Sequence, residues 1–105
     1  MKPLDVKPVD LEKVRKILER FVPEFEVRAF GSRVNGTARR NSDLDLVIMN
    51  EKPIENLTIA RLREAFSESD LPFKVDVLEW CGISDNFQKI VDKDWTIIRN
   101  KDSGL

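Results

Sequence analysis

The sequence predicts an α/β (α+β) fold in which a small mixed β-sheet has its helices packed on one face. Its 105 residues are enough for about one ordinary domain. Hydrophobic residues make up 41% of the chain and charged residues 35%, which is typical of a globular domain. Segments whose apolar residues recur at helical spacing alternate with short apolar segments typical of strands. The predicted order is helix, strand, loop, strand, helix, strand, helix, strand.

The first half of the chain predicts one helix and two strands. We expect an extended lead-in over residues 1–9, followed by Asp10 as the cap of a helix over 11–21. Apolar residues recur there at helical spacing, and the opposite face is charged. Residues 26–30 predict a short strand, and residues 43–49 predict a second strand whose later residues are apolar on both faces. The second strand is therefore expected at the centre of the sheet.

The loop between these strands, residues 31–42, has turn chemistry throughout and room for at most one short helix.

The second half of the chain predicts two helices, each followed by a strand. Apolar spacing predicts a helix that ends near Ser69, and Pro72 then introduces a strand over 73–79. Ser84 is expected to cap the next helix, and residues 95–99 predict the last strand. The expected organisation is one domain over 10–99, with a polar tail over 100–105.

Missing residue types exclude several kinds of chemistry. The chain has no histidine, so it cannot form a Ser-His-Asp or Cys-His catalytic pair or a zinc site built on imidazole. A single cysteine, Cys81, cannot form an intrachain disulfide. Tyrosine is also absent, so proton transfer near neutral pH falls to carboxylates, lysines and Cys81. This composition favours chemistry that uses carboxylates and a hard metal ion.

Charge and hydropathy also limit the partners. Eighteen basic residues against nineteen acidic ones give a net charge of −1, which lacks the broad positive field of nucleic-acid-binding proteins. The longest apolar run covers only residues 46–49, so no membrane partner is expected. The first residues contain no apolar stretch typical of a signal peptide. We therefore expect a cytoplasmic protein with no direct nucleic-acid partner.

Three aspartates are candidates for a metal site. Asp43 and Asp45 lie two residues apart on a predicted strand, so they face the same side with Cα atoms about 6.6 Å apart. Asp76 lies between Val75 and Val77, and it faces the same side if the two valines join the core. Oxygen ligands suit Mg²⁺ or Mn²⁺, and two ions could activate a hydroxyl and stabilise a leaving phosphate. The alternative is that Asp43, with Ser42, caps another element, Asp45 lies on an exposed edge, and Asp76 is a solvated residue of an alternating strand.

Gly31 and Ser32 directly follow the first predicted strand. Glycine lets a phosphate approach the backbone, and the Ser32 hydroxyl can donate a hydrogen bond to it. Arg33 is a candidate phosphate contact because guanidinium groups suit spread negative charge. For Arg39 and Arg40, a solvated loop and a binding role are equally expected. Gly-Ser alone predicts only a turn, and its meaning comes from the Asp-x-Asp that follows ten residues later.

The stretch from Gly31 to Asp45 closely resembles the signature of the DNA polymerase beta-like nucleotidyltransferase superfamily. Within it, the chain is similar to the minimal nucleotidyltransferases of prokaryotes over residues 10–99. The resemblance implies transfer of a nucleoside monophosphate from a Mg²⁺-bound triphosphate to a hydroxyl, with release of pyrophosphate. By position, Asp43 and Asp45 would hold the metal ions, and Asp76 would be the third carboxylate. Gly31 and Ser32 would bind phosphate.

Chain length limits how an acceptor could be bound, because the expected core and site use nearly all of the domain. The chain resembles minimal members of the family that are encoded beside a HEPN-domain toxin protein and act as its antitoxin. The resemblance implies that AMP moves from ATP to a tyrosine of that partner. This chain has no tyrosine, so such an acceptor must be in the partner. Two alternatives stay open. One is a non-catalytic binding module that masks the partner, and the other is an adenylyltransferase for a small hydroxylated compound.

Overall fold

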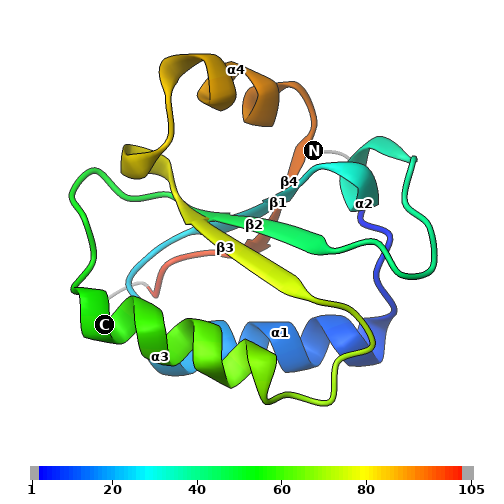
Figure 1. The fold of residues 1–105 in the computed structure, drawn as a ribbon, viewed down its shortest axis with the longest axis horizontal. Helices are drawn as coiled ribbons and strands as arrows, with labels where there is room; N and C mark the ends of the chain where they lie inside the picture. Colours follow the sequence, from blue (N-terminus) through cyan, green and yellow to red (C-terminus); the bar gives the residue numbers. More distant parts are fainter. Residues whose placement is uncertain (1–2, 103–105) are drawn as a thin grey trace.

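The computed structural model describes residues 3–102, which form one four-stranded mixed sheet and its helices (Figure 1). The strand order is β3-β2-β1-β4. The central strand β1 runs antiparallel to both β2 and β4, whereas β2 and β3 are parallel. The strands are β1 (Val27–Phe30), β2 (Leu44–Ile48), β3 (Val75–Glu79) and β4 (Trp95–Arg99). The predicted mixed sheet is confirmed, and each strand lies within its predicted range.

Two long helices cover one face of the sheet, as predicted, and a third lies on the other face (Figure 1). The helices are α1 (Pro8–Phe21), α2 (Ser32–Asn35), α3 (Asn56–Ser67) and α4 (Asp85–Lys93), with a short 3₁₀ turn, η1 (Trp80–Gly82), before α4. α1 and α3 pack side by side against the sheet. α4 departs from the predicted packing on one face: it lies on the opposite face, where its Val91 and Phe87 join Phe30 and Val47 in a second apolar cluster.

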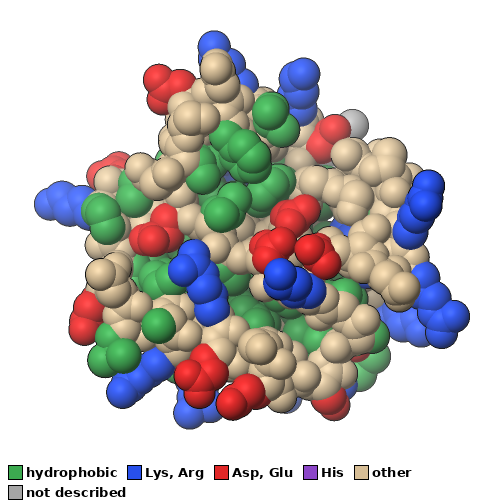
Figure 2. Space-filling view, viewed as in Figure 1, with side chains coloured by type: hydrophobic (Ala, Val, Ile, Leu, Met, Phe, Trp, Pro, Cys, Tyr) green, Lys and Arg blue, Asp and Glu red, His purple; other side chains and the backbone are tan. Residues whose placement is uncertain are grey.

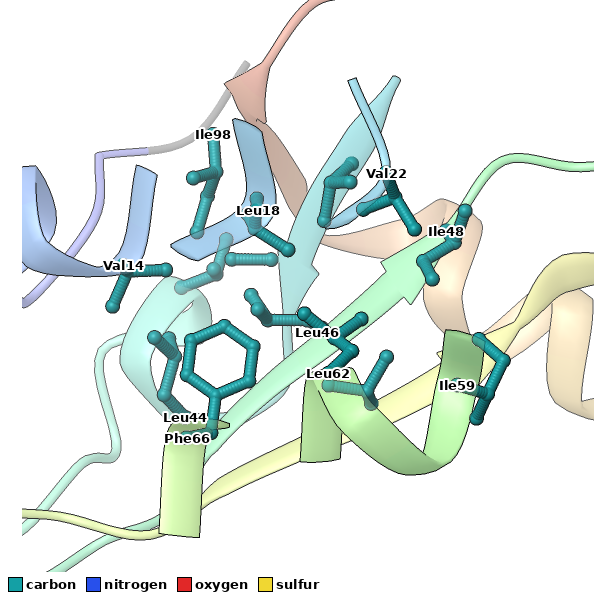
Figure 3. Close-up of a cluster of buried hydrophobic side chains, with 14 residues drawn as sticks. Val14, Leu18, Val22, Leu44, Leu46, Ile48, Ile59, Leu62, Phe66 and Ile98 are labelled. Carbon is teal, nitrogen blue, oxygen red and sulfur yellow. The ribbon is translucent and has the colours of Figure 1, made fainter. Parts of the chain in front are cut away.

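The main core lies between the sheet and helices α1 and α3 (Figure 3). Leu44, Leu46 and Ile48 of β2 are fully buried there, which confirms that alternate residues of this strand face the core. Leu18 of α1 and Leu62 of α3 are also fully buried and pack into the same cluster. The intervening residues of β2, including Asp45, must therefore face the other side of the sheet.

The first helix begins earlier than predicted. α1 starts at Pro8, so Asp10 is a buried residue of the first turn and not the cap. Proline suits the first helical position because the N–H that it lacks would have no partner there. The described part of the lead-in is therefore residues 3–7, and its Leu4 and Val6 pack against the core. Among residues 3–102, none of the helices combines the length and the apolar character needed to cross a membrane.

Candidate active site

Two aspartates lie side by side on neighbouring strands. Asp45 of β2 and Asp76 of β3 are direct partners in the parallel pairing. Leu44 and Leu46 are buried on the core face, so period-2 geometry directs Asp45 to the opposite face. Val77 is buried on the core face in the same way, while the Asp76 side chain is 46% exposed. The sequence prediction that these two carboxylates share a face of the sheet is therefore confirmed.

A glycine lies directly against Asp45. Phe30, the last residue of β1, pairs with Asp45 across the antiparallel ladder, and Gly31 follows it. Gly31 has φ 78° and ψ −153°, a backbone conformation that is essentially restricted to glycine. A Cβ at this position would lie 2.6 Å from Oδ2 of Asp45, closer than real Cβ contacts come. The turn that starts α2 and carries Ser32 is therefore packed against the acidic pair.

Asp43, the remaining predicted metal ligand, is exposed and lies one residue before β2 begins. Its charge reaches the pair, because the pKa of Asp45 is raised above its usual value of 3.8 by burial first, then by the charges of Asp76 and Asp43. Desolvation and like charges both disfavour an ionised carboxylate. Ionisation of Asp45 is therefore costly without a cation nearby.

Carboxylate oxygens suit a hard divalent cation, although these side chains do not form a complete coordination site as placed. Within residues 3–102, no three acidic or sulfur ligands stand close enough together to hold a metal ion as placed. Lys74 gives the pair little compensation, because its Nζ lies 3.9 Å from Oδ1 of Asp76 and its side chain is 75% exposed. A divalent cation held by these carboxylates would offset both causes of the raised Asp45 pKa, burial first and then the like charges of Asp76 and Asp43.

An open groove of about 750 Å³ adjoins the acidic pair and contains residues that the sequence prediction missed. Phe30 and Phe87 line it beside Asp45 and Asp76, with ring centroids 5.8 Å apart in an edge-to-face arrangement. Figure 2 shows acidic side chains on this face next to a hydrophobic patch below α4. Phe87 joins the groove through the packing of α4, which has no signal in the local sequence.

The contacts of Arg33 differ from the phosphate contact predicted for it. Its side chain is buried, with 7% exposure, and its guanidinium donates hydrogen bonds to backbone carbonyl oxygens. These acceptors are the carbonyls of Ser42, Asp5 and Arg40. The prediction that Arg33 contacts phosphate finds no support in this geometry, because the side chain is used to hold backbone segments together.

Comparisons with known proteins identify the family of this chain. The model of the nucleotidyltransferase domain family matches residues 11–100. A protein of Haemophilus influenzae named "probable protein adenylyltransferase MntA" is 48% identical over 99 residues, which cover 94% of this chain and 87% of that protein.

Two solved structures have the same fold. One, a toxin–antitoxin structure with AMP-PNP, has a TM-score of 0.71 at 24% identity, over 87% of this chain and 73% of its own. The other contains a tri-AMPylated Shewanella oneidensis HEPN toxin in complex with its MNT antitoxin. It has a TM-score of 0.66 at 19% identity, over 89% of this chain and 71% of its own. The chain therefore belongs to the nucleotidyltransferase domain family, and its resemblance to the minimal nucleotidyltransferases is confirmed.

Proposed function

We propose that this chain transfers AMP from ATP to a tyrosine hydroxyl of a partner HEPN toxin protein and so acts as its antitoxin, with Mg²⁺ as the cofactor. The observation that carries the proposal is the pairing of Asp45 and Asp76 on adjacent strands, with Asp43 before them and the Gly31 turn packed against Asp45. Carboxylates can hold the divalent ions of a metal-bound triphosphate, and an adjacent glycine turn can bind its phosphates. Mn²⁺ is a second cation that the same oxygen ligands would accept.

The proposed reaction forms one bond and breaks one. The acceptor oxygen bonds to the α-phosphorus of ATP, the bond from that phosphorus to the bridging oxygen of the β-phosphate breaks, and pyrophosphate leaves. Two divalent ions, when bound, would polarise the phosphate and stabilise the leaving oxygen. Asp43 and Asp45 would hold both ions, while Asp76 would ligate one of them and accept the proton of the acceptor hydroxyl. Gly31 and Ser32 would bind the phosphates through the turn.

A protein partner is supported by composition and by the relatives. The chain has no tyrosine, so a tyrosyl acceptor must come from another molecule. Its net charge of −1 does not favour nucleic acid as the acceptor. The relative from Haemophilus influenzae is named as a protein adenylyltransferase, and the Shewanella oneidensis complex contains an AMP-modified HEPN toxin. These names describe the relatives, and they support the same reaction for this chain.

Intact mass spectrometry of the neighbouring gene's product, the proposed HEPN partner, tests the proposal. After incubation with this chain, ATP and Mg²⁺, we expect its mass to increase by one or more AMP units. Asp43→Asn and Asp45→Asn should each abolish the increase, and Asp92→Asn should not, because Asp92 is exposed on α4 outside the site. Replacing the acceptor tyrosine by phenylalanine should also abolish it.

The same mixture separates the proposal from its two alternatives. If the chain forms a stable complex that neutralises the toxin with no mass increase, it is a stoichiometric binding module. If the purified chain instead adenylylates a small hydroxylated compound, the protein acceptor is wrong. Either result would contradict the proposed reaction.

A further inference from the structure

We infer that Arg33 is a positioning residue, whose side chain holds together the segments that carry Gly31 and Ser32, Asp43 and Asp76. The inference rests on the proposed function, because it concerns the geometry of the same site. It also gives Arg33 a role different from the phosphate contact predicted from the sequence.

The guanidinium joins α2 to the loop before β2. Nε and Nη2 of Arg33 donate to the carbonyl of Ser42 at 3.0 and 2.8 Å, and Nη2 also reaches the carbonyl of Arg40 at 3.4 Å. Ser42 immediately precedes Asp43, and Ser32 immediately precedes Arg33. One side chain therefore sets the separation between the phosphate-binding turn and the first aspartate.

The same guanidinium contacts the segment that leads into β3. It stacks over the ring of Phe73, with its central carbon 4.4 Å from the ring centroid. Phe73 lies three residues before Asp76, and its neighbour Lys74 accepts the first hydrogen bond of the parallel pairing from the N–H of Leu44 at 2.9 Å. Arg33 therefore also contacts the approach to the strand that carries the third aspartate.

The N-terminal lead-in holds Arg33 from another side. Nη1 of Arg33 donates to the carbonyl of Asp5 at 2.9 Å, and the N–H of Asp5 donates to the carbonyl of Arg33 at 2.7 Å. This reciprocal pair connects the described lead-in to α2. Residues 3–7 are therefore part of the same support, and they have a role that their sequence did not suggest.

Arginine suits this position better than other residues. Its planar guanidinium carries five N–H donors in a fixed geometry, whereas lysine offers a compact charge on a flexible stem. The bonds within the loop are local: Thr37 bonds to Asn35, and the N–H of Arg39 bonds to Oγ of Ser42. Loss of Arg33 would therefore detach this loop from α2 and leave only its short-range bonds, including that from the N–H of Ser42 to the carbonyl of Arg39, so the loop should open more often.

The test compares Arg33→Met and Arg33→Lys with a matched control, Arg20→Met. Arg20 also stacks on a phenylalanine, with its guanidinium carbon 5.1 Å from the Phe21 ring centroid, but it lies on α1 away from the site. The first readout is hydrogen exchange at three amides whose bonds depend on this support: Asp5, Ser42 and Leu44. The second is the affinity for ATP with Mn²⁺, and the third is the split of AMP transfer into kcat and KM.

For Arg33→Met we expect exchange at these amides to accelerate at least tenfold while α3 keeps its protection. We expect kcat to fall about 100-fold, since a misplacement of about 1 Å has effects of that size, and KM for ATP to change less than threefold. Arg33→Lys should fall between wild type and Arg33→Met, because lysine restores some donors without the fork. Arg20→Met should leave exchange at the three amides unchanged.

Two results would overturn the inference. One is unchanged exchange at all three amides in Arg33→Met. The other is a large loss of ATP affinity with normal kcat, rescued by lysine, which would mean a direct phosphate contact. If wild type transfers no AMP, the proposed function fails, but exchange and ATP affinity still decide the role of Arg33. If Arg33→Met does not fold, Phe73→Leu removes the ring contact while keeping apolar bulk, and the same amides should exchange faster.

Discussion

Replacing Gly31 by alanine tests the contact between the turn and the acidic pair. The new Cβ would lie 2.6 Å from Oδ2 of Asp45, whereas ordinary van der Waals contact begins at 3.4 Å. Asp45 is flanked by Phe30 and Asp76 on the neighbouring strands, and its side chain is the mobile partner. We therefore expect its carboxylate to move by at least about 0.8 Å, the difference between these two distances.

Two separate effects follow from this substitution. The φ of 78° with ψ −153° costs a residue with a side chain about 1–3 kcal/mol, so the free energy of unfolding should fall by that amount plus the cost of displacing the Asp45 carboxylate. Displacement of the Asp45 carboxylate should reduce AMP transfer about 100-fold, because catalysis depends on placement within about 1 Å. The loss of activity should therefore exceed what the loss of stability explains.

Two other glycines provide matched controls. Gly36 has φ 85° but no atom within 4 Å of a built Cβ, so Gly36→Ala tests backbone strain without a clash. Gly82 has neither a positive φ nor a close neighbour, so Gly82→Ala should leave stability unchanged or raise it by about 0.4–1 kcal/mol. Urea unfolding at pH 7 gives the free energies, and AMP transfer is measured on the folded proteins at saturating ATP.

A double-mutant cycle isolates the clash. In an Asp45→Ala background the carboxylate is gone, so Gly31→Ala should cost only the backbone strain. The reasoning is refuted if Gly31→Ala retains wild-type AMP transfer, or if its stability cost is the same whether residue 45 is aspartate or alanine.

The remaining predictions concern charge, cations, capping and the core. The pKa of Asp45 is raised, so its ionisation lowers the free energy of unfolding at pH values above that pKa and has no effect below pH 3.8. Urea unfolding should therefore show Asp45→Asn to be more stable than wild type at pH 7, with the advantage shrinking as the pH falls toward 3.8. Mg²⁺ at ten times its Kd should raise the free energy of unfolding of wild type by about 1.4 kcal/mol, and a smaller gain is expected in Asp45→Asn. Ser84→Ala should lower the free energy of unfolding by about 1 kcal/mol, because Oγ of Ser84 accepts the N–H of Phe87 at 3.1 Å. In chemical denaturation Leu62→Ala should cost about 2–5 kcal/mol, since Leu62 is fully buried, whereas Leu57→Ala, at a side chain with 52% exposure, should cost far less.

Local patterns in the sequence were sufficient to predict the helices and strands, and to predict which face of the sheet carries Asp45 and Asp76. Alternation along β2 placed Leu44 and Leu46 in the core and Asp45 opposite, because successive side chains of a strand point to opposite faces. Ser84 was correctly predicted as a helix cap, since capping depends on residues only three positions apart. Asp10 was wrongly predicted as a cap, because Pro8 begins the helix one turn earlier.

Other features depend on contacts between segments far apart in the chain, and only the tertiary structure decided them. The pairing of Asp45 with Asp76 joins residues 31 positions apart. The packing of α4 over Phe30 and the capture of the Ser42 carbonyl by Arg33 likewise have no local signal. An arginine beside a glycine turn can bind a phosphate or donate to backbone carbonyls, and its position relative to neighbouring residues in the sequence is the same in both cases. Local propensity and alternation therefore determined the elements and their faces, whereas the partners of each side chain were decided by how the elements pack.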